Sequence, residues 1–298
     1  MGEARYRWGK CARVWEPKQV DRLGSFAMNT PGGHKFVFIC GLHRSGTSPL
    51  FRILREHPEI SGFSNTGAPE DEGQHLQTVF PAAKRYGGPG RFGFVPEAHL
   101  TEQSELMTAE NRRRLFEEWS EYWDLTKPWL LEKSPPNLIR TRFLQAVFPD
   151  SYFIVLFRHP VAVSFATRKW ARSSLDSLVE HWLHCHRLFK QDSPHLRHVL
   201  LIRYEDLIQT SERTLGQVYS FLGLAPHVSA ALNPAGNERY FSDWMKLSDE
   251  TNGRAVLRRL TERYAQEVQL YGYSLTDCGS QPVGSLRAMR SQEMQRGH

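Results

Sequence analysis

Cysteine is scarce in this chain of 298 residues, and the few cysteines form no recognisable framework. The four cysteines are widely separated, and no C-x-x-C pair occurs among them. Clustered cysteines are the usual sign of structural disulfides or zinc sites, so we expect neither, and we expect no bound metal. Isolated thiols are typical of a reducing compartment, which favours a cytoplasmic protein.

Membrane-spanning and secretory segments are also missing from the sequence. No apolar run approaches the roughly 20 residues of a transmembrane helix. The N-terminus has basic residues but no apolar stretch of signal-peptide length, and no N-x-[ST] glycosylation acceptor occurs anywhere. We therefore expect a soluble protein without a membrane partner.

Charge of one sign does not dominate the composition. The chain has 38 Lys and Arg against 32 Asp and Glu, a formal net charge of +6. An excess of this size suits an anionic ligand but does not require nucleic acid, and no RNA-binding signature or basic stripe accompanies it. We expect no nucleic-acid partner, and the sequence does not indicate an oligomeric state.

Short, fully apolar runs alternate with helical patterns through most of the chain. The clearest runs are residues 36–40, 152–157 and 199–202, each long enough for one strand buried on both faces. This alternation over 35–225 predicts an α/β fold, a P-loop-type parallel β-sheet with helices on both faces. We expect one domain over 35–275, preceded by a lead-in segment at 1–34 and followed by a disordered tail at 276–298.

A glycine-rich loop follows the first apolar run. Gly41 and Gly46 are separated by four residues, and a helical pattern begins directly after them. Such a loop can surround a phosphate or sulfate with backbone N–H groups and the positive end of a helix. The spacing matches the Walker A pattern, except that Thr47 replaces its lysine and Arg44 lies inside the loop. The simpler alternative is a turn that only connects a strand to a helix.

This loop resembles the 5′-phosphosulfate loop of sulfotransferases that use 3′-phosphoadenosine 5′-phosphosulfate (PAPS). The likeness is to the R-S-G-T-[TS] form of the tyrosylprotein and bacterial branches. It implies that the loop binds the 5′-phosphosulfate and that its arginine also stabilises the leaving phosphate oxygen during catalysis. The implied ligands are Arg44, Ser45, Gly46, Thr47 and Ser48.

A second segment of the resemblance is Arg158, which follows the run 152–157. In the family, an arginine at this strand end and a serine eight residues later bind the ribose 3′-phosphate. Here the later position is Ala166, so the sequence departs from the pattern. Ser164 and Thr167 are the available hydroxyls, and their spacing places both on one helical face. A surface arginine at a strand end is the simpler alternative for Arg158.

Three further segments add to the resemblance. Residues 132–135, E-K-S-P, are similar to a family segment whose lysine reaches the transferring sulfuryl group, which implies a catalytic role for Lys133. Residues 204–207, Y-E-D-L, match a late family motif whose acids we interpret as mainly structural. Residues 237–244 are weakly similar to the family's C-terminal nucleotide loop, but the frequent R-K-G form is absent.

The general base is expected in the acidic loop at 69–75. Tyrosylprotein-type enzymes keep a glutamate in this part of the chain, so we predict Glu70 or Glu72, with His75 as a third candidate. A carboxylate could take the proton of the acceptor hydroxyl once the acceptor is bound. A solvated acidic turn is the alternative for each residue.

Together these segments predict a sulfotransferase that moves the sulfuryl group of PAPS to a hydroxyl by in-line displacement. The acceptor is a small molecule, a glycan or a peptide, and the sequence does not choose among them. The alternatives are a P-loop small-molecule kinase and a non-catalytic nucleotide-binding protein. The missing Walker lysine disfavours a kinase.

Overall fold

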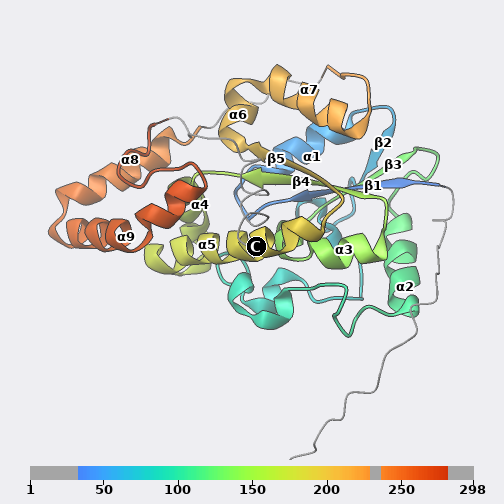
Figure 1. The fold of residues 1–298 in the computed structure, drawn as a ribbon, viewed down its shortest axis with the longest axis horizontal. Coiled ribbons are helices and arrows are strands. Elements are labelled where there is room, and N and C mark those ends of the chain that lie inside the picture. Colours follow the sequence, from blue (N-terminus) through green and yellow to red (C-terminus); the bar gives the residue numbers. More distant parts are fainter. Residues whose placement is uncertain (1–32, 229–235, 281–298) are drawn as a thin grey trace, which may run out of the picture.

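We analysed a computed structural model of the protein, which describes residues 33–228 and 236–280. The lead-in expected at 1–34 and the tail expected at 276–298 therefore fall almost entirely outside the described residues. Figure 1 shows a central sheet with helices above and below it.

The central sheet has five strands, and every pair of neighbours is parallel. Its order is β2-β3-β1-β4-β5, so the first strand of the chain lies in the middle. The carboxyl ends of β1, β3 and β4 consequently meet at one edge, where ligands bind in open α/β sheets. The strands are β1 (Lys35–Cys40), β2 (Ile60–Gly62), β3 (Trp129–Lys133), β4 (Ser151–Phe157) and β5 (His198–Arg203).

Helices cover both faces of the sheet, as the alternating pattern predicts. In Figure 1, α1, α6 and α7 lie above the sheet, and α3 and α5 lie below it. This arrangement confirms the expected P-loop-type α/β architecture. The α-helices are α1 (Thr47–Arg55), α2 (Ala109–Ser120), α3 (Thr141–Val147), α4 (Pro160–Ala171), α5 (Leu175–Asp192), α6 (Tyr204–Gln209), α7 (Ser211–Leu222), α8 (Glu238–Lys246) and α9 (Thr251–Leu270).

One predicted helix is divided in two. The pattern over 137–148 indicates a continuous helix, but the chain forms a 3-10 turn at Pro135–Ile139 and then α3. The break is at Arg140, which has non-helical backbone angles and a fully buried side chain. Its guanidinium donates to the carbonyls of Ala98 and Pro81. These distant carbonyls bind Nε and Nη2 of the buried cation, while Nη1 has no hydrogen-bond partner among the described residues. Local sequence patterns do not reveal such contacts.

An aromatic layer joins the sheet to α2. Phe36 and Phe38 of β1 are fully buried, and both lie against Phe148, with ring centroids 4.3 and 5.7 Å apart. Trp119 of α2 stacks on the same Phe148 at 5.8 Å. Burial of large rings stabilises strongly, so this layer fixes the strand whose far end carries the glycine-rich loop.

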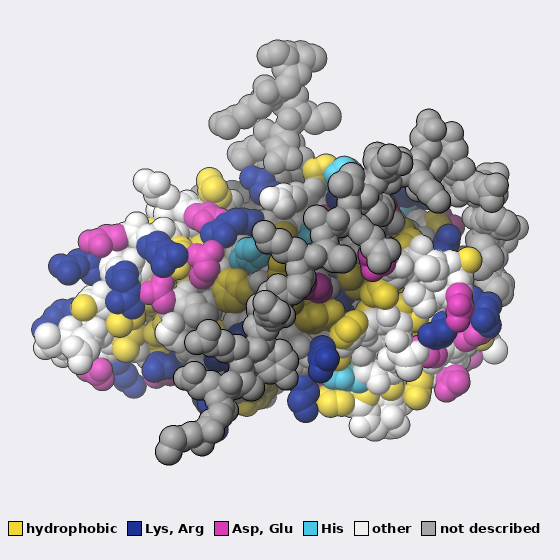
Figure 2. All heavy atoms as spheres, turned by 90° about the horizontal axis from the view of Figure 1, so that it is seen from below, with side chains coloured by type: hydrophobic (Ala, Val, Ile, Leu, Met, Phe, Trp, Pro, Cys, Tyr) yellow, Lys and Arg dark blue, Asp and Glu magenta, His cyan; other side chains and the backbone are white. Residues whose placement is uncertain are grey.

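Charge on the visible surface is mixed. In Figure 2, basic and acidic side chains alternate over the end of the molecule that carries α8 and α9. Ion pairs such as Arg259–Asp176 and Arg263–Asp176 tie α9 to α5 there. On the face seen in Figure 2, basic and acidic side chains are therefore interspersed over this end.

Four histidines should make stability depend on pH. Burial lowers the pKa of His43 and His181 to about 3, and of His159 and His186 to about 4. They are neutral in the folded protein, whereas the unfolded chain binds their protons near pH 6.5. The free energy of unfolding should therefore be maintained above pH 6.5 and fall as the pH drops towards 4. Burial raises the pKa of Glu132 to about 7, which opposes this trend, but only one such group stands against the four histidines.

Urea unfolding at several pH values between about 7.5 and about 4.5 would measure this dependence. Replacing His186 with Gln should reduce the loss of stability at acid pH, because one of the four histidines no longer titrates. An identical pH dependence in wild type and His186→Gln would contradict the assignment.

Candidate active site

The glycine-rich loop connects the end of β1 to the start of α1. Gly46 is the N-cap residue of α1 and has a φ of 96°, a conformation that favours glycine. A Cβ at Gly46 would lie 2.3 Å from Cδ2 of Tyr204, so no side chain fits there. Glycine is thus required at this position for both backbone shape and space.

The loop has the features of an anion site. Ser45 is completely buried, and its Oγ has no hydrogen-bond partner among the described residues. Thr47 and Ser48 begin the nine-residue α1, whose positive end faces the loop. Arg44 is exposed, and its guanidinium lies 4.8 Å from the ring of Trp170. Stacking on a ring leaves the edge N–H groups of an arginine available to an oxyanion.

Lys133 lies at the centre of the site and is completely buried. Its Nζ donates to three acceptors: Ser48 Oγ at 3.2 Å, the Glu70 carbonyl at 3.1 Å and Glu72 Oε1 at 3.1 Å. An ammonium has three donors, so all of them are used. Lys133 thus connects β3 to the start of α1 and to the acidic loop.

The acidic loop presents its three candidate bases differently. The carboxylate of Glu72 is nearly buried and pairs with Lys133. Glu70 has a left-handed backbone (φ 54°), and its side chain points outward, 60% exposed and 3.9 Å from Arg52. His75 Nε2 lies 3.9 Å from Glu72 Oε2 at the surface. Of the three, Glu72 is the residue whose carboxylate contacts Lys133, which also binds Ser48 at the start of α1.

Glu132 supports this loop from the end of β3. Its carboxylate is completely buried and accepts from the Gly73 N–H at 2.9 Å, from the Ser134 hydroxyl at 2.6 Å and from the Asn137 amide. Burial raises the pKa of Glu132 to about 7, against the lowering effect of these donors. Trp119 donates to the Gly73 carbonyl at 2.9 Å. The backbone at Gly73 is therefore held on both sides.

Arg158 binds the loop from the neighbouring strand end. Its Nη1 donates to the Arg44 carbonyl at 2.8 Å, and its Nε donates to Asn237 Oδ1 at 2.8 Å. The guanidinium also stacks on Tyr204, 4.0 Å from the ring centroid. Glu205 accepts from Asn237 at 2.6 Å, which fixes the asparagine behind the arginine. Glu205 therefore positions Arg158 indirectly, through its hydrogen bond with Asn237.

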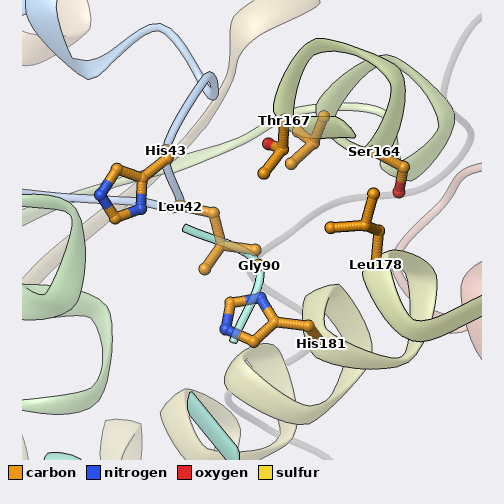
Figure 3. Close-up of a pocket in the computed structure, with 8 residues that line it drawn as sticks. Leu42, His43, Gly90, Ser164, Thr167, Leu178 and His181 are labelled. Atoms are coloured by element: carbon orange, nitrogen blue, oxygen red, sulfur yellow. The ribbon is translucent and has the colours of Figure 1, made fainter. Parts of the chain in front are cut away.

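Ser164 and Thr167 lie on the inner face of α4, away from α8. Both are buried, and their hydroxyls have no partner among the described residues. Figure 3 shows them around a space that His43 and His181 also line. Its volume is about 10 Å³, roughly the room of one water. The predicted placement of both hydroxyls on one face of the helix agrees with the structure. The cavity between them is too small for a phosphate in this conformation.

Ala166, the position where the family has its serine, faces the other way. Ala162 and Ala166 pack against Tyr240 at the start of α8. Most of the segment 237–244 is helical. The methyl side chain of Ala166 therefore lies against a tyrosine ring, whereas Ser164 and Thr167 line the small cavity.

The sequence assigns no role to three residues at this edge. Tyr204 lies between Gly46 and Arg158, and the sequence marks it only as the first residue of the Y-E-D-L motif. Asn237 is 79 residues from Arg158 in the chain, and only the weak similarity of residues 237–244 points to its segment. His43 lies in the loop with Nδ1 buried and unpartnered among the described residues. Burial, then the charge of Lys133, lowers the pKa of His43 to about 3, so its ring is neutral.

Within residues 33–228 and 236–280, none of the helices is both long enough and apolar enough to span a membrane. Over the same ranges, no group of three or more His, Cys, Asp or Glu is arranged to hold a metal ion.

Comparisons with known proteins identify the family. A family profile described as "Sulfotransferase family" matches residues 37–227, and no curated protein matches the chain. Sulfotransferase STF1 from Mycobacterium tuberculosis H37Rv is 17% identical (TM-score 0.43) over 64% of this chain and 68% of that one. The enzyme from Alicyclobacillus acidocaldarius is 17% identical (TM-score 0.41) over 78% and 98%. Mouse sulfotransferase SULT7A1, solved with PAP, is 14% identical (TM-score 0.38) over 65% and 59%.

These structural likenesses are too distant to describe the site, so the family assignment rests on the sequence profile. The matched segment covers well over half of the chain. It begins within β1 and ends beyond α7, so it includes the glycine-rich loop, Lys133, Arg158 and Tyr204. The chain belongs to the sulfotransferase family.

Proposed function

We propose that this sulfotransferase takes the sulfuryl group from PAPS and transfers it to a hydroxyl acceptor by in-line displacement. The observation that supports this most directly is the position of Lys133. Its ammonium touches Ser48 of the phosphate loop and Glu72 of the acidic loop at the same time. The glycine-rich loop proposed to bind an anion and the proposed base therefore both contact the same buried cation.

The loop residues suit the 5′-phosphosulfate of the donor. Arg44 has edge donors available, Ser45 has an unpaired buried hydroxyl, and Gly46 allows close approach of the backbone. Thr47 and Ser48 add hydroxyls at the positive end of α1. We infer that these five residues hold the phosphosulfate and that Arg44 offsets the charge that develops on the leaving phosphate.

The 3′-phosphate of the donor is assigned to Arg158. Two of its three nitrogens bind the Arg44 carbonyl and Asn237, which leaves Nη2 for a ligand. Ser164 and Thr167 remain proposed ligands as well, but they can reach a phosphate only if the small cavity on the inner face of α4 opens.

Glu72 is proposed as the general base. It would accept the proton of the acceptor hydroxyl while the acceptor oxygen bonds to sulfur and the bond from sulfur to the phosphate oxygen breaks. Lys133 would offset negative charge on the sulfuryl oxygens during this exchange. Glu72 accepts only one of the three donors of Lys133, so the lysine can exchange a contact for a sulfuryl oxygen without becoming unpaired.

We also propose the cytoplasm as the compartment. The thiols of Cys40, Cys185 and Cys278 are free and buried, as is usual where thiols stay reduced. The acceptor, whether small molecule, glycan or peptide, is left to experiment.

An acceptor screen with sulfur-labelled PAPS tests the function directly. Phenols, sugars and tyrosine peptides should be offered with and without added Mg²⁺, and products identified by mass spectrometry. We expect label on at least one hydroxyl in both conditions. Transfer from ATP that requires Mg²⁺ would identify a kinase instead. Binding of 3′-phosphoadenosine 5′-phosphate (PAP) without any turnover of PAPS would identify a non-catalytic binding protein.

Arg44→Ala should weaken binding of PAP roughly 10- to 150-fold, because it removes a charge-assisted contact worth about 1.5–3 kcal/mol. Arg52→Ala is the matched control, since Arg52 is exposed on α1 and its one ion pair within the described part of the chain is with Glu70. Isothermal calorimetry measures both. Equal affinities of the two variants for PAP would contradict a contact between Arg44 and the nucleotide.

Glu72→Gln should lower single-turnover rates by roughly 10²–10⁴, because an amide cannot accept the proton. Affinity for PAP should change little. Glu70→Gln is the control from the same loop and should remain near wild type, because its side chain points into solvent. A larger loss in Glu70→Gln than in Glu72→Gln would reverse the assignment.

A further inference from the structure

Both oxygens of the Glu72 carboxylate have a donor of their own. Oε1 accepts from Lys133 Nζ at 3.1 Å, and Oε2 accepts from Gln74 Nε2 at 2.5 Å. A carboxylate held by one donor can still rotate about its last torsion. Two donors on opposite oxygens fix the plane of the group. Gln74 is therefore the second restraint on this carboxylate.

Gln74 is itself fixed at three points and is nearly buried. Its Oε1 accepts from the Ala83 N–H at 2.8 Å, so its Nε2 must be the atom that faces Glu72. Its backbone N–H donates to Ser134 Oγ at 2.9 Å, and Ser134 in turn donates to Glu132. The glutamine is thus attached to the end of β3 and cannot turn its amide without losing a bond.

The neutral charge of the glutamine matters for the base. A charged donor in the place of Gln74 would stabilise the ionised form of Glu72 and make its carboxylate a weaker base. An amide N–H supplies direction without adding charge. Each carboxylate oxygen has two lone pairs, so each can accept one donor and keep one for a reacting hydroxyl.

We propose that Gln74 is a positioning residue for Glu72, holding the carboxylate in the plane that receives the proton of the acceptor hydroxyl. This inference rests on the proposed function. It assigns no contact with substrate to Gln74, which acts only through Glu72. Its loss should lower the rate of the chemical step and leave donor binding intact.

The test compares Gln74→Met with Gln77→Met. Gln77 belongs to the same loop and makes three side-chain bonds, to the Gln74 carbonyl and to both backbone groups of Phe80, but none to Glu72. Single-turnover rates are measured with labelled PAPS and the best acceptor of the screen, or with water as acceptor. We expect a loss of roughly 10- to 100-fold for Gln74→Met and less than about threefold for Gln77→Met. Affinity for PAP should stay within about threefold in both.

A double-mutant cycle separates positioning from a general loss of structure. In the Glu72→Gln background, Gln74→Met should have no further effect on the rate, because the group that it positions is absent. An equal loss in both backgrounds, or a rate above half of wild type for Gln74→Met alone, overturns the proposal. If Gln74→Met does not fold, Gln74→Glu replaces it, since its carboxylate still accepts from Ala83. Wild-type protein that neither binds PAP nor consumes PAPS would overturn the proposed function itself, and this inference with it.

Discussion

The site depends on one buried ammonium. Lys133 has no exposure to solvent, so burial of its charge would be unfavourable without three acceptors around it. Those acceptors come from Ser48 on α1 and from Glu70 and Glu72 in the acidic loop, while the lysine itself ends β3. Satisfying this charge therefore brings together three segments that are distant in the sequence.

A second chain of contacts fixes the other side of the phosphate loop. Arg158 holds the loop by the Arg44 carbonyl and is held in turn by Asn237 and Tyr204. Glu205 secures Asn237 and also accepts from the His159 N–H at 3.0 Å. The loop is thus restrained from β3 through Lys133 and from β4 through Arg158. Restraint from both sides limits the movement of the backbone between β1 and α1.

In the acidic loop, the sequence identifies candidate bases but not the orientation of their side chains. Sequence reasoning selects Glu70, Glu72 and His75 as candidates, because all three lie in the expected part of the chain. It does not choose among them, since a loop has no fixed periodicity from which side-chain direction follows. The left-handed backbone at Glu70 turns that side chain outward, and the contact with Lys133 turns Glu72 inward. Both features depend on residues far away in the chain.

The sequence by itself determined the parallel sheet and the loop at the end of its first strand, because apolar runs and glycine spacing are local patterns. The end of a predicted strand made Arg158 a candidate, because the carboxyl ends of parallel strands share one edge. Lys133 became a candidate through the resemblance of residues 132–135 to a family segment. Only the tertiary structure decided that Ser164 and Thr167 face a small buried cavity and that α8 covers Ala166. Those outcomes depend on which helix packs against which face, and packing brings together residues whose separation in the chain carries no local signal.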